Sequence, residues 1–248
     1  MKVSLIILTF NRADTVKGAV GHNLEVARYP VHELIHVDNG STDNVREVMD
    51  VFGPRTKVYH STNRGVSRGY NAGYAMATGD FVCITGCDRI MPDGWLAAWV
   101  DCFEKIPNTG IISCYSCDIS HVPERNRGFP SVIADIPIQP CMPLEARIMR
   151  RELFLEIGYL DEGFGLYARE DLCWAERAEK ILTEKGLLSY TLPHFQAQHL
   201  GTEGVNEWDG KDHKLYHDFK RREVDNPASE ARLVWNRANH YPKHNPFA

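Results

Sequence analysis

Four predicted strands alternate with helix-length segments over the first 85 positions of this 248-residue chain. The strands are Lys2–Thr9, Leu34–Val37, Lys57–His60 and Phe81–Thr85, and the first and last of them are continuous apolar runs rich in β-branched residues. An apolar run without polar alternation is typical of a strand that is covered on both faces, as in a parallel sheet. The alternation therefore predicts an α/β fold with right-handed crossovers and a mostly parallel, twisted sheet flanked by helices.

The helices predicted between these strands begin at polar turns. Asn11-Arg12 opens the first, which lasts to about Ala27, and Ser41 or Thr42 can cap the second. The spacing predicts the second and third helices over Val45–Phe52 and Val66–Met76.

The pattern is less regular in the second half of the chain. We expect a helix over Gly94–Lys105, a strand over Ile111–Cys117 and a further helix over Arg169–Glu184. Leu187–His199 carries at least one more strand. Residues 118–143 contain five prolines and little periodicity, which predicts a long irregular loop of the kind that often forms a binding surface.

Composition restricts the class of protein. Hydrophobic residues make up 43% of the chain, charged residues 25%, and the net charge is −5, so the whole molecule does not attract nucleic acid. The apolar run Val3–Phe10 is far shorter than the roughly 20 residues of a membrane span, and we expect no span. Seven cysteines, an odd number, predict reduced thiols and a cytoplasmic protein. Cys114 and Cys117 lack a second pair at zinc-ribbon spacing, so we expect them on opposite sides of a strand.

Acidic residues follow two of the predicted strands. Asp38 comes after the second strand and Asp88 after the fourth, with a helix containing Gly69 and Gly73 between them. Ligands of α/β proteins bind at the carboxyl ends of strands. Small residues on that helix allow either the approach of a ligand or close packing of the helix on the sheet.

Several motifs, in order, resemble those of family 2 glycosyltransferases of the GT-A fold. They are T-F-N-R, D-N-G-S-T-D, N-R-G-V-S-R-G-Y-N-A-G, the acid at Asp88, R-E-D-L-C-W-A-E-R and H-L-G-T. The resemblance covers about residues 1–205. It implies a Rossmann-like GT-A domain with a nucleotide-binding half, 1–90, and an acceptor and catalytic half, 91–205. We expect residues 206–248 to be a helical C-terminal extension packed on this domain.

The resemblance also implies a nucleotide-sugar donor, most often a UDP-sugar. Asp38 matches the residue that accepts a hydrogen bond from the base, although a turn with a helix cap explains the same residues. Asp43 fits a capping position better. The other implied donor-binding residues follow the first strand, line the third helix or end the fourth strand: Thr9, Asn11, Arg12, Asn63, Gly65, Arg68, Asn71 and Asp88. For Gly69 and Gly73 we favour packing.

Asp88 and His199 match the metal site of the family, which holds Mn²⁺ or Mg²⁺ on the donor diphosphate. This sequence reads Gly86-Cys87-Asp88-Arg89, so one acid remains of the usual D-x-D cluster. One carboxylate suffices for Mg²⁺ when phosphate and water supply the other ligands. A histidine ligand favours Mn²⁺. Arg89 could instead neutralise the phosphate.

Glu170 and Asp171 match the acidic signature that supplies the catalytic base in this inverting family. A carboxylate within hydrogen-bond reach can take the proton of an attacking sugar hydroxyl. We expect Asp171 to be the base, with Glu170 the second choice. Acids in a first helical turn also stabilise a helix without any catalytic role.

The acceptor stays open: a glycan, a lipid-linked sugar, a protein or a hydroxylated nucleic-acid base. Two other functions are considered. The reduced acidic cluster favours a binding module that has lost turnover, and Glu170-Asp171 argues against it. A nucleotidyltransferase would need a glycine- and lysine-bearing phosphate loop near the first strand, which T-F-N-R-A-D lacks.

Overall fold

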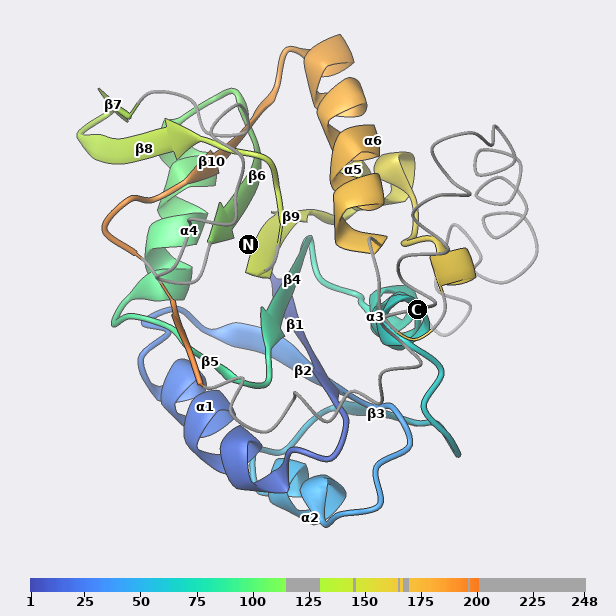
Figure 1. Ribbon diagram of the computed structural model, residues 1–248. Helices are drawn as coiled ribbons and strands as arrows, with labels where there is room; N and C mark the ends of the chain where they lie inside the picture. Colours follow the sequence, from blue (N-terminus) through green and yellow to red (C-terminus); the bar gives the residue numbers. More distant parts are fainter. Residues whose placement is uncertain (115–129, 145, 165, 167–169, 196, 201–248) are drawn as a thin grey trace.

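A computed structural model describes residues 1–114, 130–144, 146–164, 166, 170–195 and 197–200. Its centre is a nine-stranded sheet in the order β3-β2-β1-β4-β9-β6-β10-β8-β7 (Figure 1). The strands of the first half are β1 (Val3–Thr9), β2 (Val31–Asp38), β3 (Thr56–Tyr59) and β4 (Phe81–Gly86). They pair in parallel, with β1 between β2 and β4. This part matches the expected alternation closely.

The second half of the sheet is mixed. Its strands are β6 (Thr109–Cys114), β7 (Ser131–Ile133), β8 (Ile136–Pro140), β9 (Ala146–Arg150) and β10 (Leu188–Thr191). β9 lies between β4 and β6 and is antiparallel to both. A separate two-stranded sheet joins β5 (Arg89–Ile90) to β11 (Gln198–His199). The fold is thus α/β with a large, mostly parallel sheet flanked by helices, and the predicted fold class is confirmed.

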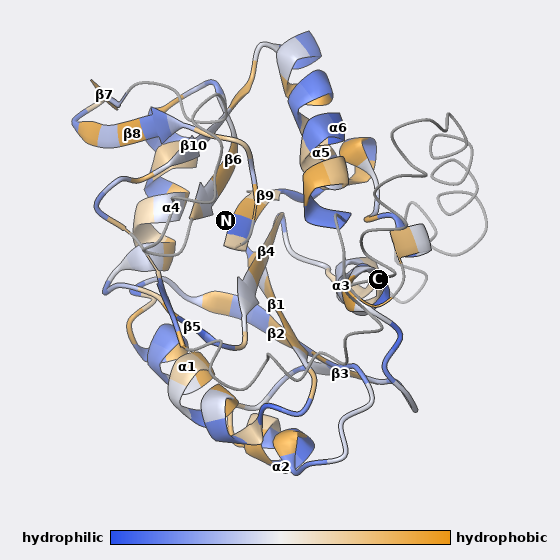
Figure 2. Ribbon diagram, viewed as in Figure 1, coloured by the Kyte–Doolittle hydropathy of each residue, from blue (hydrophilic) through white to orange (hydrophobic). Residues whose placement is uncertain are grey.

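The helices cover both faces of the sheet (Figure 1). The core on one face includes residues of α1 (Ala13–Glu25), α2 (Val45–Asp50) and α4 (Trp95–Lys105). The core on the other includes residues of α3 (Val66–Met76), α5 (Arg151–Ile157) and α6 (Glu170–Lys185). Figure 2 shows the central strands largely hydrophobic while α1 and α6 mix both kinds of residue, as helices that cover a sheet from solvent do. None of the helices in the described ranges is long and apolar enough to cross a bilayer.

The prediction of an irregular loop over residues 118–143 was wrong for its second part. Residues 131–140 form the hairpin β7–β8, whose two-residue turn, Ala134-Asp135, has φ values of 50° and 65°. Prolines are typical of loops, and Pro137 and Pro140 lie in β8, so the sequence did not predict this hairpin. β10 pairs only with Gln139 and Pro140 of β8, so Pro137 lies beyond that pairing and need not donate to β10. Residues 118–129 lie outside the described part, as do Cys117 and the predicted extension 206–248.

Candidate active site

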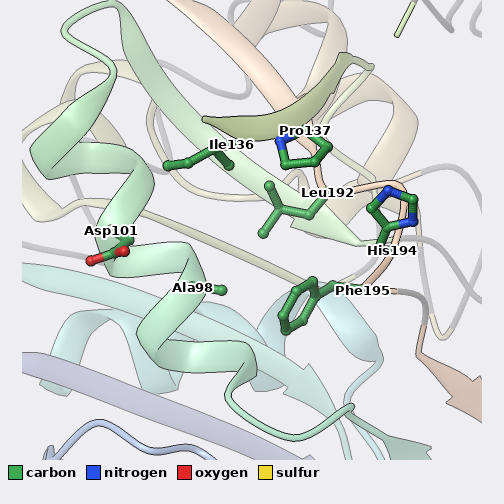
Figure 3. A pocket seen from close by; sticks show the side chains of 7 residues that line it. All are labelled: Ala98, Asp101, Ile136, Pro137, Leu192, His194 and Phe195. Atoms are coloured by element: carbon green, nitrogen blue, oxygen red, sulfur yellow. The ribbon is translucent and has the colours of Figure 1, made fainter. Parts of the chain in front are cut away.

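An apolar pocket of about 100 Å³ lies on the α4 side of the sheet (Figure 3). It contains none of the residues that the sequence predicts for the site. Its lining comes from α4, β8 and the segment after β10: Ala98, Asp101, Ile136, Pro137, Leu192, His194 and Phe195. The candidate site is instead at the carboxyl ends of the parallel strands.

β1 brings the two predicted strand-end acids to one edge of the sheet. Thr9 pairs with Asp38 on one side, and Leu8 pairs with Gly86, two residues before Asp88, on the other. Neighbouring strands are about 4.8 Å apart, so the ends of β2 and β4 are separated by about 10 Å. That is the edge at which ligands of α/β folds bind.

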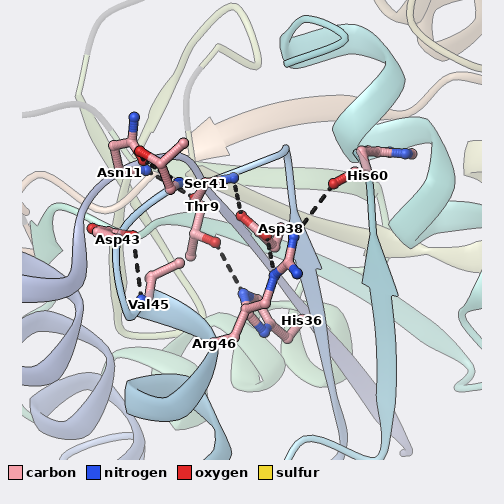
Figure 4. A network of polar contacts seen from close by, with 10 residues as sticks. Thr9, Asn11, His36, Asp38, Ser41, Asp43, Val45, Arg46 and His60 are labelled. Atoms are coloured by element: carbon pink, nitrogen blue, oxygen red, sulfur yellow. Dashed lines mark hydrogen bonds and ion pairs between the residues drawn. The ribbon is translucent and has the colours of Figure 1, made fainter. Parts of the chain in front are cut away.

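Asp38 is fully buried, and both of its carboxylate oxygens accept hydrogen bonds (Figure 4). Ser41 N donates to Oδ1 at 3.0 Å, and Arg46 Nε donates to Oδ2 at 2.5 Å. The Arg46 guanidinium also lies 4.6 Å from the centre of the Tyr59 ring. Nothing in the sequence singles out Arg46, because a basic residue in a predicted helix usually faces solvent. Contact between Asp38 and a base stays a prediction.

Thr9 is also buried, and its hydroxyl lies 2.9 Å from Nε2 of His36 on β2. Burial lowers the pKa of His36 to about 4, so its ring is neutral near pH 7. Thr9 and His36 therefore form a buried hydrogen-bonded pair near the carboxyl ends of β1 and β2, next to Asp38.

The turn before α1 is bonded to the turn before α2. Asn11 has a left-handed φ of 50°, its N donates to Ser41 Oγ, and its Oδ1 accepts from Thr42 N. Asp43 accepts from Ala13 N at 2.9 Å and from Val45 N at 3.2 Å. Asp43 thus accepts from the first N–H of two helices, as expected of a capping acid, whereas the N-cap residue of α2 is Asn44 and not Ser41 or Thr42.

Arg12 precedes α1 near Cys87. Burial raises the pKa of the Cys87 thiol to about 12, with a further rise from Asp88 and an opposing effect of the Arg12 charge. This coupling places Arg12 within electrostatic reach of the turn that carries Asp88.

The start of α3 is built for a tight turn. Gly65 precedes the helix with φ 91°, and its N donates to Asn63 Oδ1 at 2.9 Å. A Cβ at Gly69 would clash with the side chain of Leu8, and one at Gly73 with Ile6. These contacts confirm that Gly69 and Gly73 serve close packing of α3 on the sheet.

Asn71 is fully buried in α3, and its amide holds the turn after α5. Its Oδ1 accepts from Leu160 N, and its Nδ2 donates to Leu160 O, each at 2.9 Å. Nδ2 also donates to Glu162 Oε1 at 3.0 Å, and Arg68 Nε donates to Glu162 Oε2 at 3.1 Å. Both predicted donor residues of α3 therefore converge on Glu162, which the sequence analysis did not single out. Whether they also contact a donor stays a prediction.

Asp88 and His199 are 111 positions apart in the chain, yet the β5–β11 sheet brings them together. His199 Nε2 lies 3.4 Å from Asp88 Oδ2, and the side chains are 31% and 23% exposed. Leu200 N also donates to Asp88 O at 2.8 Å. An oxygen and an imidazole nitrogen at the surface suit Mn²⁺ as a donor set. The described residues include no group of three possible ligands, so phosphate and water would have to complete the coordination.

Glu170 and Asp171 form the first turn of α6. Glu170 is buried, while Asp171 is half-buried and its Oδ1 accepts from Leu172 N at 2.7 Å. No hydrogen bond or ion pair among the described residues joins Asp171 to Asp38 or Asp88. Val66 N, the first donor of α3, donates to Leu166 O at 2.9 Å, which places Leu166, four residues before α6, at the start of α3.

Two further contacts fix α6. Trp174 Nε1 donates to Gly158 O at 2.7 Å, and Arg177 Nη2 donates to Tyr159 O at 2.6 Å. The buried guanidinium of Arg147, on β9, lies 4.2 Å from the centre of the Trp174 ring. The acids of α6 are thus carried by a helix anchored to the central sheet and to the turn that Asn71 holds.

A family model described as "Glycosyl transferase family 2" matches residues 4–172, about two thirds of the chain. An uncharacterized glycosyltransferase of a Nostoc species is 30% identical over 116 residues, which are 45% of this chain and 36% of that protein. The chain thus spans about a third of the length of the curated relatives it matches.

Solved glycosyltransferase structures share the fold. The mannosyltransferase PcManGT of Pyrobaculum calidifontis, in complex with GDP-Man and Mn²⁺, aligns with a TM-score of 0.60 and 20% identity over 96% of this chain and 75% of its own. GalNAc-T7 with UDP, GalNAc and Mn²⁺ aligns with a TM-score of 0.64 and 13% identity over 98% of this chain and 58% of its own.

Proposed function

Because this chain belongs to glycosyl transferase family 2, we propose that it moves a sugar from a nucleotide-diphosphate sugar to an acceptor hydroxyl. The observation that carries the proposal is the pairing of Asp88 with His199 at the carboxyl edge of the sheet. This pair lies at the end of β4, on the same edge as Asp38 and the turn before α3. Structures of the same fold contain a nucleotide sugar or a nucleotide, together with Mn²⁺.

The donor base lies near Asp38 in this proposal, and UDP is the preferred nucleotide. Thr9 ends β1 beside Asp38, and Asn11, which precedes Arg12, is bonded to the turn after β2. Asn39 of that turn donates to Asn63 Oδ1 and to Gly65 O. Arg68 supplies positive charge for the diphosphate, since a guanidinium donates to phosphate oxygens in a fixed fork.

Asp88 and His199 are the residues that would hold a divalent cation, Mn²⁺ or Mg²⁺. A cation bound there supplies charge stabilisation to the leaving diphosphate. The imidazole of His199 favours Mn²⁺ over Mg²⁺.

Asp171 is proposed as the general base. Its carboxylate accepts the proton of the acceptor hydroxyl while that oxygen attacks the anomeric carbon from the face opposite the diphosphate, which inverts the configuration. Asp171 is half-buried whereas Glu170 is buried, so Asp171 is the more accessible of the two acids.

The alternative is a nucleotide-sugar-binding module with weakened turnover. The lone acid of the Gly86–Arg89 turn favours it, because the cluster has lost one carboxylate. Hydrolysis of a UDP-sugar in the presence of Mn²⁺ separates the two functions: the enzyme releases free sugar slowly without an acceptor, and the module releases none.

A thermal-shift panel tests the donor assignment. UDP, GDP and their sugars are each added with and without Mn²⁺, and we expect UDP or a UDP-sugar to raise the melting temperature most. Asp88→Ala should remove the metal-dependent part of that shift. Asp101→Asn, on the surface of α4, is the matched control and should leave it intact. A panel in which no nucleotide changes the melting temperature contradicts the proposal.

A further inference from the structure

We propose that Glu162 is a positioning residue that holds Arg68 for the donor diphosphate and ties it to the helix of the catalytic base. The inference rests on the proposed function and adds a residue to it. Glu162 lies in the short 3-10 turn Glu162–Phe164, between α5 and α6.

The Glu162 carboxylate accepts from two side chains of α3. Its side chain is 9% exposed, whereas that of Arg68 is 48% exposed. Arg68 Nε donates to Oε2 at 3.1 Å and Asn71 Nδ2 donates to Oε1 at 3.0 Å, one turn apart on α3. The carboxylate is thus the fixed partner, and Arg68 is the long side chain that it restrains.

Only an acid satisfies both donors at this position. A carboxylate accepts on both oxygens, whereas an amide of the same shape has one acceptor and one donor. In Glu162→Gln an amide nitrogen replaces one of the two oxygens, so at one of the two contacts two N–H donors face each other. Asn71 is fully buried, and both the nitrogen and the oxygen of its amide are bonded to the Leu160 backbone. The contact with the exposed Arg68 is therefore the one that is lost.

The contact uses the inner nitrogen of the guanidinium. A guanidinium has five N–H groups, and the bond to Glu162 occupies the one on Nε. Holding Nε leaves both terminal amino groups to form the fork that matches phosphate oxygens. It also reduces the conformational entropy that a free arginine loses when it binds.

The same turn is bonded to α6. Trp174 donates to Gly158 O and Arg177 donates to Tyr159 O, while Asn71 binds Leu160. Gly158–Glu162 thus joins the helix that carries Arg68 to the helix that carries Asp171. Glu162 sets the position of a phosphate-binding group relative to the base.

The test measures nucleotide affinity by calorimetry in Glu162→Gln, with Glu156→Gln, an exposed acid of α5, as the control. UDP and UMP are compared, or GDP and GMP if these bind the wild type better. We expect Glu162→Gln to weaken the diphosphate about ten-fold, the size of one lost charge-assisted bond, and to leave the monophosphate unchanged. In Arg68→Ala the diphosphate weakens as well, and adding Glu162→Gln causes no further loss.

Equal weakening of diphosphate and monophosphate would show a merely structural role and overturn the inference. So would an additive loss in the double variant. Arg68→Ala changes an exposed side chain and is the safeguard if Glu162→Gln fails to fold; unchanged diphosphate affinity in Arg68→Ala overturns the inference by itself. A wild type that binds no nucleotide at all instead removes the proposed function on which the inference rests.

Discussion

The acids that follow β2 and β4 lie in opposite surroundings at the same edge of the sheet. Asp38 is fully buried and accepts from Ser41 and from Arg46. Asp88 is partly exposed, and its side chain has a longer 3.4 Å contact with His199. Asp38 is therefore held in a buried, hydrogen-bonded frame, and Asp88 is the acid with more room for a further ligand.

The β2 side is thus fixed before a ligand binds, whereas the β4 side holds the groups that can take part in the reaction. The β2 side, with Thr9, His36, Asp38 and Arg46, is bonded before any ligand arrives. The β4 side offers an oxygen and a nitrogen that a cation can share. Substitutions on the two sides should accordingly change different quantities, stability on the first and turnover on the second.

The largest effect is expected from Asp88→Asn. Loss of the charge that holds a cation on the diphosphate should lower the metal-dependent turnover about 100- to 1,000-fold, as for other groups that stabilise developing charge. The free energy of unfolding should change by no more than about 0.5 kcal/mol, because the partly exposed side chain has a single long contact with His199. Turnover of a UDP-sugar with Mn²⁺ and urea unfolding provide the two readouts. Marked destabilisation of Asp88→Asn with unchanged turnover would contradict the proposed difference between the β2 side and the β4 side.

The pH dependence of the free energy of unfolding tests the β2 side through His36. Its pKa is about 4 when folded and about 6.5 as a free side chain, because burial disfavours the charged ring. The unfolded state therefore binds a proton first, and the free energy of unfolding falls as pH decreases from about 6.5 to about 4, by up to about 3 kcal/mol. His36→Gln should remove that part of the slope in urea unfolding. A slope identical to that of the wild type would contradict a buried neutral His36.

Asp38→Ala should cost stability. It removes the partner of Arg46 and the acceptor of Ser41 N, and hydrogen bonds to charged groups are worth about 2 kcal/mol. Arg46→Met leaves the fully buried Asp38 carboxylate without its cation and should cost at least as much, because an uncompensated buried charge is strongly destabilising. Urea midpoints measure both variants. If Asp38→Ala were as stable as the wild type, Asp38 would not belong to the frame.

Glu33 is the control acid at the opposite edge of the sheet. Its Oε1 accepts from Ser4 Oγ, Thr78 N and Thr78 Oγ1. Burial alone would raise the pKa of Glu33, but these bonds outweigh it and the pKa is lowered. The stabilisation is present above the unfolded pKa and is lost as pH falls through the folded pKa. Glu33→Gln keeps the acceptor and should cost about 1 kcal/mol at pH 7, converging with the wild type in acid, and nucleotide affinity should not change.

The same contrast explains what could be predicted from the sequence. The parallel half follows from local patterns: the structure places α3 over Val66–Met76 as predicted, with Gly65 at φ 91° before its first residue and an extended Ala77 after its last. The mixed half depends on pairing between distant segments. Nothing near β9 indicates that it inserts between β4 and β6, and the prolines of β8 resemble loop residues.

Site residues divide in the same way. Asp88 and His199 were predicted from motifs, and the structure brings them together. Arg46 and Glu162 were missed because their roles depend on side chains that fold next to them. Glu162 and Arg68 are 94 positions apart in the chain, and no local sequence pattern predicts their contact.

Manganese binding tests the central claim most directly. Mn²⁺ is titrated into the protein with and without saturating UDP, and free Mn²⁺ is followed by its electron paramagnetic resonance signal. We predict one bound Mn²⁺ per chain that requires UDP, at least ten-fold weaker binding in Asp88→Asn, and no change in Asp101→Asn. Binding that is independent of UDP, or that is equal in Asp88→Asn and the wild type, would contradict a cation site on the β4 side.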